Sequence, residues 1–244
     1  MGIPINLARK LEILENLIPR RFQLPLRYYG QRLLGALEPE MKYLSLLVNP
    51  SMIAIDAGAN KGIYSYALSR CAKHVYCFEP ISELCAYIKN YQSNKLTVIN
   101  SALSDETGKL TLKIPIKDGK RITTRASLVC HDEGELRQVD VNKLDSYGYK
   151  DVGFIKIDVE GAEEKVIMGG LSTIKEYNPV LLIEMFYEKN QSERCRKLFN
   201  FLMGIGYKAI SIDKFGPQVC NERIFECTEL SRNIIFVPNG HNFL

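Results

Sequence analysis

Several features that would point to particular classes of protein are missing from this sequence. It has no tryptophan, and none of its seven cysteines is paired at C-x-x-C spacing, so neither a zinc knuckle nor a redox motif is indicated. An odd number of scattered cysteines also argues against a disulfide framework. No apolar run approaches the roughly 18 residues of a transmembrane helix, so no membrane span is expected.

The composition that is present is that of an ordinary globular protein. Hydrophobic residues make up 46% and charged residues 25% of the 244 residues, which suits one large domain with its own core. The net charge of +4 argues neither for nor against a nucleic-acid partner. The first residues lack the apolar region and cleavage site of a secretory signal, so we expect a cytoplasmic protein.

Residues 1–48 are expected to form an N-terminal helical extension, and residues 49–244 the main domain. Leu7, Leu11, Leu14 and Leu17 recur at helical spacing. This amphipathic stretch predicts a helix that docks on the main domain or forms a homodimer contact. Weak contact with a membrane surface is the alternative.

From residue 51 onward, apolar runs typical of strands alternate with segments of helical spacing. Strands are expected at 52–57, 74–78, 96–100, 152–157, 180–185, 207–212 and 233–237. Helices are expected at 61–71, 82–93, 162–176 and 192–205. Strands alternating with helices predict βαβ units, and continuous apolar strands predict a parallel sheet buried on both faces. The expected fold class is therefore α/β.

The region of about 105–145 breaks this alternation. It lacks helical spacing, and K-L-T-L-K-I-P-I and R-Q-V-D-V alternate as exposed strands do, which predicts an antiparallel β insertion over the carboxyl edge of the sheet. The first part of the insertion is basic, with cations at Lys109, Lys113, Lys117, Lys120, Arg121 and Arg125. These cations form either a solvated strand face or a lip that attracts an anionic acceptor.

The turn after the first strand, I-D-A-G-A-N-K-G, has the position of a nucleotide-binding turn. A dinucleotide site needs G-x-G-x-x-G so that the backbone can approach a pyrophosphate. Here only Gly58 lies early in the turn, and the carboxylate of Asp56 would repel a pyrophosphate. A cationic ligand without phosphate, such as S-adenosylmethionine, suits this turn. Asp56 would face its amino-acid end, Gly58 would let the backbone pass beneath it, and Asn60 would cap the following helix.

The next two strands offer further contacts to such a donor. Glu79 lies 23 residues after Asp56, at the tip of the second strand, where an acidic residue can bind ribose hydroxyls. Ser101 and Ala102 follow the third strand and are expected near the adenine. The glycine turn and this acid together are much stronger evidence than the glycine turn alone.

Acidic residues follow the fourth and fifth strands. The fourth strand ends in F-I-K-I-D-V-E-G-A-E-E, whose alternation places Lys156, Asp158 and Glu160 on one side, and Glu184 lies at the tip of the fifth strand. Charged groups in a crevice are costly unless they are used or paired. Asp158 is the first candidate for a general base or for orienting an acceptor hydroxyl beside the donor, and Glu184 is the next.

Other interpretations of these residues remain open. Lys156 can simply neutralise a carboxylate, and Glu160 can cap the helix that follows. Asp158, Glu160 and Glu184 can alternatively gather a magnesium ion, although we expect no metal. His131, in the stretch C-H-D-E-G, is a further catalytic candidate if the insertion folds over the site.

Together these segments resemble the FkbM family of S-adenosylmethionine-dependent methyltransferases. The resemblance covers about residues 50–188 and rests on I-D-A-G-A-N-K-G, C-F-E-P, A-L-S-D-E-T-G, L-D-S-Y, F-I-K-I-D-V-E-G-A-E and N-P-V-L-L-I-E. It implies a Rossmann-like class I methyltransferase fold, with seven strands of which the last is antiparallel. It also implies O-methylation of a sugar, glycan or natural-product hydroxyl. Asp158, Glu160 and Glu184 would border the reaction centre.

The sequence disfavours three rival functions. A nicotinamide oxidoreductase would need further early glycines in the turn. A non-catalytic S-adenosylmethionine-binding module would not need acids at the fourth strand tip. Nucleic-acid methyltransferases usually show an N-P-P-Y-like tetrapeptide or a P-C dipeptide, and neither occurs here. A small-molecule acceptor is therefore expected rather than a nucleic acid.

Overall fold

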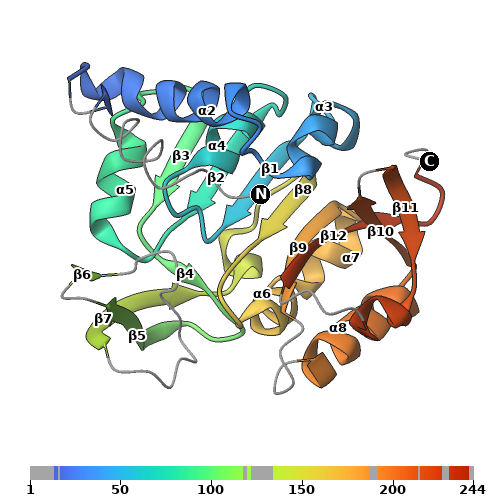
Figure 1. Ribbon diagram of the computed structural model, residues 1–244. Helices are drawn as coiled ribbons and strands as arrows, with labels where there is room; N and C mark the ends of the chain where they lie inside the picture. The colour runs from blue at the N-terminus through green and yellow to red at the C-terminus, as the bar shows by residue number, and fades with distance from the viewer. Residues whose placement is uncertain are drawn as a thin grey trace.

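The main sheet of the protein runs through the middle of the molecule (Figure 1). The computed structural model describes residues 14–15, 17–117, 120–121, 134–186, 192–213, 215–226 and 231–241. Its strand order is β11-β10-β12-β9-β8-β1-β2-β3. The strands are β1 (Ile53–Ala57), β2 (His74–Phe78), β3 (Leu96–Ile99), β8 (Val152–Ile157), β9 (Val180–Phe186), β10 (Tyr207–Asp213), β11 (Gly216–Cys220) and β12 (Ser231–Pro238).

The pairing of these strands confirms the predicted fold class. β3, β2, β1, β8 and β9 are parallel neighbours, whereas β12 is antiparallel to both β9 and β10. Within the described residues the sheet has eight strands rather than seven, because β11 extends it at the edge beside β10. The sequence G-P-Q-V-C of β11 gave no strand signal, since it contains a proline and its residues are only partly buried.

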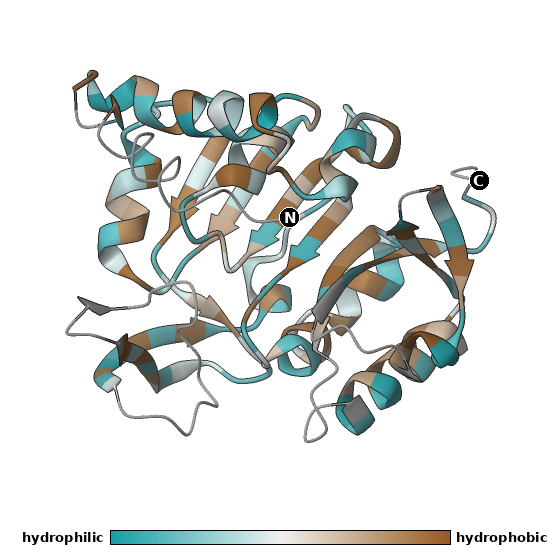
Figure 2. Ribbon diagram, in the orientation of Figure 1, coloured by the Kyte–Doolittle hydropathy of each residue, from teal (hydrophilic) through white to brown (hydrophobic). Residues whose placement is uncertain are grey.

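Helices cover both faces of this sheet (Figure 1). One face packs against α2 (Gln23–Leu33), η2 (Pro39–Tyr43), α3 (Leu44–Leu47), α4 (Ile63–Ser69) and Ile88 of α5 (Ser82–Lys89). The other face packs against η4 (Leu144–Tyr147), α6 (Glu163–Gly169), α7 (Leu171–Tyr177), α8 (Ser192–Gly204) and η5 (Glu222–Glu226). Figure 2 shows the strands as predominantly hydrophobic, and every residue of β1 is buried, as expected for a sheet covered on both sides.

Two helices occupy the range in which one was predicted, because α6 ends at Gly169 and α7 begins after Gly170. A Cβ atom on Gly169 would lie 1.9 Å from the carbonyl oxygen of Ser104. The glycine therefore lets the helix end pack directly against the backbone at Ser104.

A second sheet lies beside the carboxyl ends of β2 and β3 (Figure 1). Its order is β4-β7-β5-β6, and its strands are β4 (Ala102–Leu103), β5 (Gly108–Lys117), β6 (Lys120–Arg121) and β7 (Gly134–Asn142). β5 and β7 are antiparallel. The inward side chains of these strands form a small apolar core with Ile81 and Leu84, which fixes the sheet against the rest of the protein.

The predicted basic lip of this insertion can be followed only in part. Lys109 is exposed, and its Nζ lies 3.4 Å from Oδ1 of Asp140, so one cation of the predicted lip is already paired with an acid. Arg125 and His131 lie outside the described residues.

The segment before β1 packs on the face of the sheet that α4 covers. α2 contacts α4, and η2 contacts β10, so this segment crosses the sheet (Figure 1). The part of the predicted amphipathic helix before residue 14 lies outside the described residues. No helix in the described part of the chain has both the length and the apolar character needed to cross a membrane.

Candidate active site

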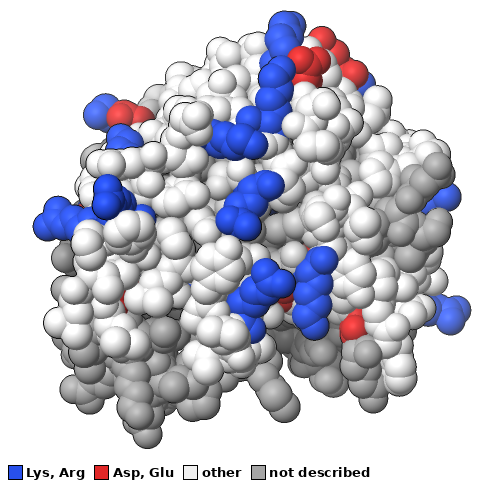
Figure 3. Space-filling view, turned by 90° about the horizontal axis from the view of Figure 1, so that it is seen from above, with Lys and Arg blue, Asp and Glu red and all other residues white. Residues whose placement is uncertain are grey.

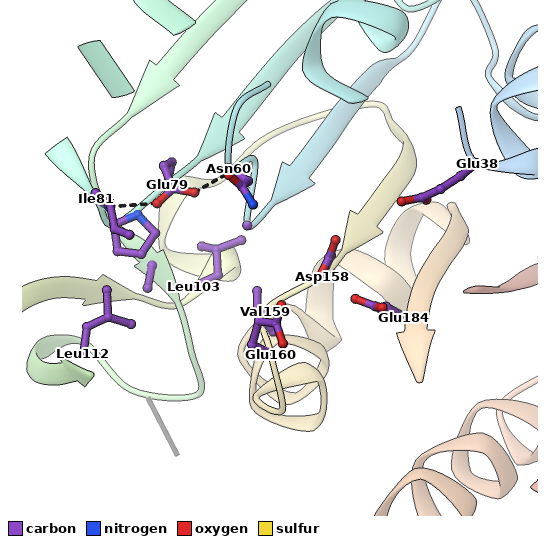
Figure 4. Close-up of a pocket in the computed structure, with 13 residues that line it drawn as sticks. Glu38, Asn60, Glu79, Ile81, Leu103, Leu112, Asp158, Val159, Glu160 and Glu184 are labelled. Carbon is purple, nitrogen blue, oxygen red and sulfur yellow. Dashed lines mark hydrogen bonds between the residues drawn. The ribbon is translucent and has the colours of Figure 1, made fainter. Parts of the chain in front are cut away.

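A cavity of about 250 Å³ opens at the carboxyl ends of β1, β2, β8 and β9 (Figure 4). Ligands of open parallel sheets bind at this edge, where the strand order reverses. Its lining residues are Glu38, Gly58, Asn60, Glu79, Pro80, Ile81, Ala102, Leu103, Leu112, Asp158, Val159, Glu160 and Glu184. Five of these carry carboxylates, and none of the described lining residues is a lysine or arginine.

The turn after β1 begins with Gly58, whose φ of 80° is a left-handed conformation that L side chains rarely adopt. A Cβ atom there would lie 1.8 Å from the carbonyl oxygen of Asp158. The backbone nitrogen of Gly58 donates to the carbonyl of Phe78 at 3.0 Å. The glycine thus allows the turn to lie between the ends of β2 and β8.

Asn60 does not cap a helix, and this prediction was wrong. α4 begins at Ile63, its N-cap residue is Gly62, and no side chain bonds to the cap. Asn60 instead adopts φ 49°, and its backbone N–H donates to Oε2 of Glu79 at 2.7 Å. Its side-chain Oδ1 is buried without a hydrogen-bond partner, so an acceptor is left beside the cavity.

Glu79 lies at the end of β2, as predicted, and is fixed by the backbone on both sides (Figure 4). Its Oε2 accepts from Asn60, and its Oε1 accepts from the N–H of Ile81 at 2.8 Å. Burial raises the pKa of Glu79 to about 7, although both backbone hydrogen bonds lower it. Each oxygen keeps a second lone pair, so the carboxylate can still accept from a ligand hydroxyl.

Asp56 is more deeply buried than the sequence suggested. Its side chain lines a neighbouring cavity of about 360 Å³ and not the cavity of Figure 4. Its Oδ2 accepts from the hydroxyl of Ser65 at 2.5 Å, and its Oδ1 has no hydrogen-bond partner. Burial raises the pKa of Asp56, and the charge of Lys156 opposes this rise.

Lys156 is the cation that balances these acids. Its side chain is only 2% exposed, and Nζ donates to Oδ2 of Asp158 at 2.9 Å. Nζ also lies 4.5 Å from the ring centroid of Tyr64. Burial lowers the pKa of Lys156, but the charges of Asp158 and Asp56 outweigh this effect and the net shift is upward. The structure thus shows the pairing that the sequence left open.

Asp158 and Glu184 form a hydrogen-bonded carboxyl pair with opposite pKa shifts. Burial opposes ionisation of Asp158, but Lys156 and the hydrogen bond to Glu184 lower its pKa overall. Burial, together with the charge of Asp158, raises the pKa of Glu184 to about 9. At neutral pH Glu184 therefore holds the shared proton and donates to the ionised Asp158.

Glu160 completes a group of three carboxylates whose ligand oxygens all lie within 4.8 Å of one another (Figure 4). Glu160 has a φ of 52°, which turns the chain after β8 and breaks the strand alternation assumed from sequence. Such a group can hold a cation, but here Asp158 already pairs with Lys156 and shares a proton with Glu184. His131, the other catalytic candidate, lies outside the described residues.

Two further residues, Ala102 and Ser101, were predicted to lie near the adenine of the methyl donor, and the structure places only Ala102 in the cavity lining. Ala102 lines the cavity with Leu103 and Leu112, which form an apolar wall. The side chain of Ser101 instead lies 3.0 Å from the carbonyl oxygen of Asp140 in β7 and accepts from Asn142 at 3.0 Å. Ser101 therefore joins the two sheets and does not line the cavity.

Glu38 is a lining residue that sequence reasoning missed. It precedes η2, and its Oε2 accepts from the hydroxyl of Tyr64 at 2.5 Å and from Nδ2 of Asn233 at 2.7 Å. Because Glu38 comes from the segment before β1, no motif near the strand tips could have indicated it. Its position brings a further carboxylate to the side of the cavity occupied by Asp158 and Glu184 (Figure 4).

The raised pKa of Glu184 predicts a pH-dependent contribution to stability. Between about pH 4.5 and pH 9 the folded protein holds a proton that the unfolded chain releases, so raising the pH through this window lowers the free energy of unfolding. The loss can reach about 1.4 kcal/mol per pH unit. Glu184→Gln keeps an N–H donor toward Asp158 and does not titrate.

Urea unfolding of the wild type and Glu184→Gln at pH 6 and pH 8.5 measures this contribution. We expect the wild type to lose stability relative to the variant as the pH rises. The other buried acids titrate in both proteins and cancel in the comparison. An unchanged difference between the two proteins at both pH values would show that Glu184 titrates as an ordinary carboxyl group.

Comparisons with known proteins agree with this geometry. A domain model described as the methyltransferase FkbM domain matches residues 56–209, more than half of the chain. Methyltransferase FkbM from Methylobacillus flagellatus KT is similar in structure, with 16% identity, a TM-score of 0.51, and coverage of 94% of this chain and 58% of that one. A Clostridium thermocellum structure provisionally described as an rRNA methylase has 14% identity, a TM-score of 0.51, and coverage of 82% and 93%. No curated protein matches in sequence.

These matches define the fold and the family. The sheet and its helices form a Rossmann-like class I methyltransferase fold, as the resemblance implied. This chain belongs to the FkbM methyltransferase family. It spans 58% of the length of the Methylobacillus flagellatus protein.

Proposed function

We propose that this protein binds S-adenosylmethionine and transfers its methyl group to a hydroxyl oxygen of a small-molecule or glycan acceptor. The observation that carries the proposal is the acidic character of the cavity, whose described lining has five acidic side chains, with Glu184 protonated, and no basic side chain. Such a lining favours a ligand with a sulfonium and an ammonium group and disfavours a pyrophosphate. Bound S-adenosylmethionine would supply a methyl group activated by its positive sulfur.

The unpaired oxygens of the site fit the polar groups of this donor. Oδ1 of Asp56 and Oδ1 of Asn60 are buried acceptors without partners, which is costly unless a ligand satisfies them. Asp56 and Asn60 both border the neighbouring cavity, so an ammonium group there would have two acceptors. Glu79 would bind ribose hydroxyls, and the apolar wall that includes Ala102 and Leu112 would contact the adenine.

Asp158 is the proposed base. It is ionised, it lies at the tip of β8, and its side chain is about 30% exposed, so an acceptor hydroxyl can approach it. Lys156 and the protonated Glu184 fix the direction of its carboxylate. Methyl transfer is an in-line displacement, in which alignment of the reacting atoms can contribute roughly 7–11 kcal/mol. Glu160 and Glu38 would border the acceptor.

A methyl-release assay with sugars, glycans, nucleotide sugars and RNA tests the acceptor class. We expect turnover with a hydroxyl-bearing small molecule or glycan and none with RNA. Methylation of RNA would favour the nucleic-acid alternative. Donor binding without turnover on any hydroxyl acceptor would favour a non-catalytic binding module. The same assay with EDTA tests whether Asp158, Glu160 and Glu184 hold a metal ion that methyl transfer needs. An unchanged rate is expected, because Lys156 already pairs with Asp158 as its cation.

A further inference from the structure

A second and larger groove, of about 940 Å³, opens on the face of the sheet covered by α2 and α4, between α2, η2, α3 and the end of α4. Its lining differs in charge from that of the active-site cavity. Three cationic side chains, Arg32, Lys42 and Arg70, contribute to it, and Glu38 is the acidic residue in its described lining. Figure 3 shows the face above α2, where lysine and arginine side chains gather and acidic ones lie mainly at the margins.

The three cations are available to a ligand. All three residues are exposed, and none forms a salt bridge with an acidic residue in the described ranges. The guanidinium of Arg70 lies 5.8 Å and 5.9 Å from the ring centroids of Tyr66 and Tyr29, which restrict its position. The carboxylate of Glu38 accepts hydrogen bonds from Tyr64 and Asn233, and its single negative charge is outnumbered by the three cations of the groove.

The groove adjoins the active-site region along the segment 36–41. It shares Ala36, Leu37, Glu38 and Met41 with the 360 Å³ cavity that contains Asp56. That cavity in turn shares Glu38, Gly58, Asn60 and Asp158 with the active-site cavity. Glu38 therefore borders all three spaces, and the groove lies next to the cavities that contain Asp56 and Asp158.

We propose that this groove binds a phosphate group of the acceptor and so directs the acceptor hydroxyl toward Asp158. The inference rests on the proposed function and adds the chemical class of the acceptor. Arginine side chains bind phosphate oxygens in pairs, and lysine adds a compact charge. Separate acidic and basic sites would keep a cationic donor and an anionic acceptor from competing for one position.

The same phosphate chemistry can come from a soluble sugar phosphate or from a lipid headgroup. Leu33 and Leu34, which follow Arg32, are 87% and 40% exposed. These apolar side chains would contact the acyl region beside a lipid phosphate, whereas a soluble phosphate would not require them. Probes of both kinds therefore separate the two sources.

The test uses the full chain and the double variant Arg32→Gln/Arg70→Gln, with Arg223→Gln as the control. Arg223 is an exposed arginine of η5 on the opposite face of the sheet. Calorimetry measures binding of inorganic pyrophosphate, and cosedimentation measures binding to phosphatidylcholine vesicles with and without phosphatidylglycerol. Thermal unfolding shows that the variants are folded, and binding of S-adenosylmethionine is measured in parallel.

We expect the wild type and the control to bind at least one probe. The double variant should bind the same probe with an affinity lower by about tenfold or more. Pyrophosphate binding would identify a soluble phosphate, whereas vesicle binding alone, lost also in Leu33→Ser, would identify a lipid headgroup. Equal binding by the double variant, or no binding of either probe by the wild type, would overturn the proposal. If the protein binds S-adenosylmethionine, the proposed function stands whether or not the groove binds a phosphate probe. If it does not bind S-adenosylmethionine, the proposed function is wrong whatever the groove binds.

Discussion

Replacement of Asp158 with asparagine is expected to lower the turnover number for methyl transfer by about 10²–10⁴-fold. Asparagine keeps the size of the side chain and can still accept from Lys156, which donates to Asp158 at 2.9 Å in the wild type. It cannot take a proton from an acceptor hydroxyl. The expected loss is therefore in the turnover number, with a smaller change in the binding of the donor.

The control for this variant is Glu164→Gln. Glu164 is a half-exposed acid of α6 that pairs with Arg194 at 3.3 Å and does not line the described cavity. Its substitution should leave turnover unchanged. The base assignment would fail if Asp158→Asn methylated at the wild-type rate. A loss of donor affinity that accounts for the whole effect would instead assign Asp158 to donor binding.

Substitution of Gly58 with alanine is expected to have the largest effect on the site as a whole. The added Cβ would overlap the carbonyl oxygen of Asp158 at 1.8 Å, and the residue would keep a φ of 80°. A left-handed conformation costs an alanine roughly 1–2 kcal/mol, and a backbone clash adds about 1–3 kcal/mol or more. The turn must then move away from β8, so both stability and donor binding should fall.

Gly35→Ala separates the clash from the backbone conformation. Gly35 also has a left-handed φ, of 62°, but a Cβ atom there would meet nothing within 4 Å. This control should lose only about 1–2 kcal/mol of stability and keep its affinity for the donor. Urea unfolding and donor titration of both variants make the comparison. Similar losses in the two variants would show that the approach of the turn to β8 does not matter.

Much of the fold could be predicted because the strands are buried on both faces. β8, for example, is apolar apart from Lys156 and is followed directly by Asp158, and β9 is apolar up to Glu184 near its end. Hydrophobic runs followed by acidic residues predicted both the parallel sheet and the acidic residues at the carboxyl ends of its strands. Glu79 was placed correctly at the end of β2 for the same reason.

The errors arose where tertiary contacts decide the local structure. Asn60 has the chemistry of a helix cap, but the left-handed turn carries the helix start on to Ile63. Ser101 follows the third strand as expected, and its place near the adenine stays a prediction, because only its hydroxyl is seen to contact β7. Glu38 reaches the site only because the segment before β1 crosses the sheet. No spacing in the sequence encodes such contacts.

The most direct test of the account is calorimetric titration of the full chain with S-adenosylmethionine, followed by NAD as a competitor. The account predicts that S-adenosylmethionine binds with one site per chain and that NAD does not displace it, because the described lining of the cavity is acidic and has no basic side chain. Failure to bind S-adenosylmethionine at millimolar concentration, or its displacement by NAD, would contradict the claim that this acidic cavity selects a cationic, phosphate-free donor.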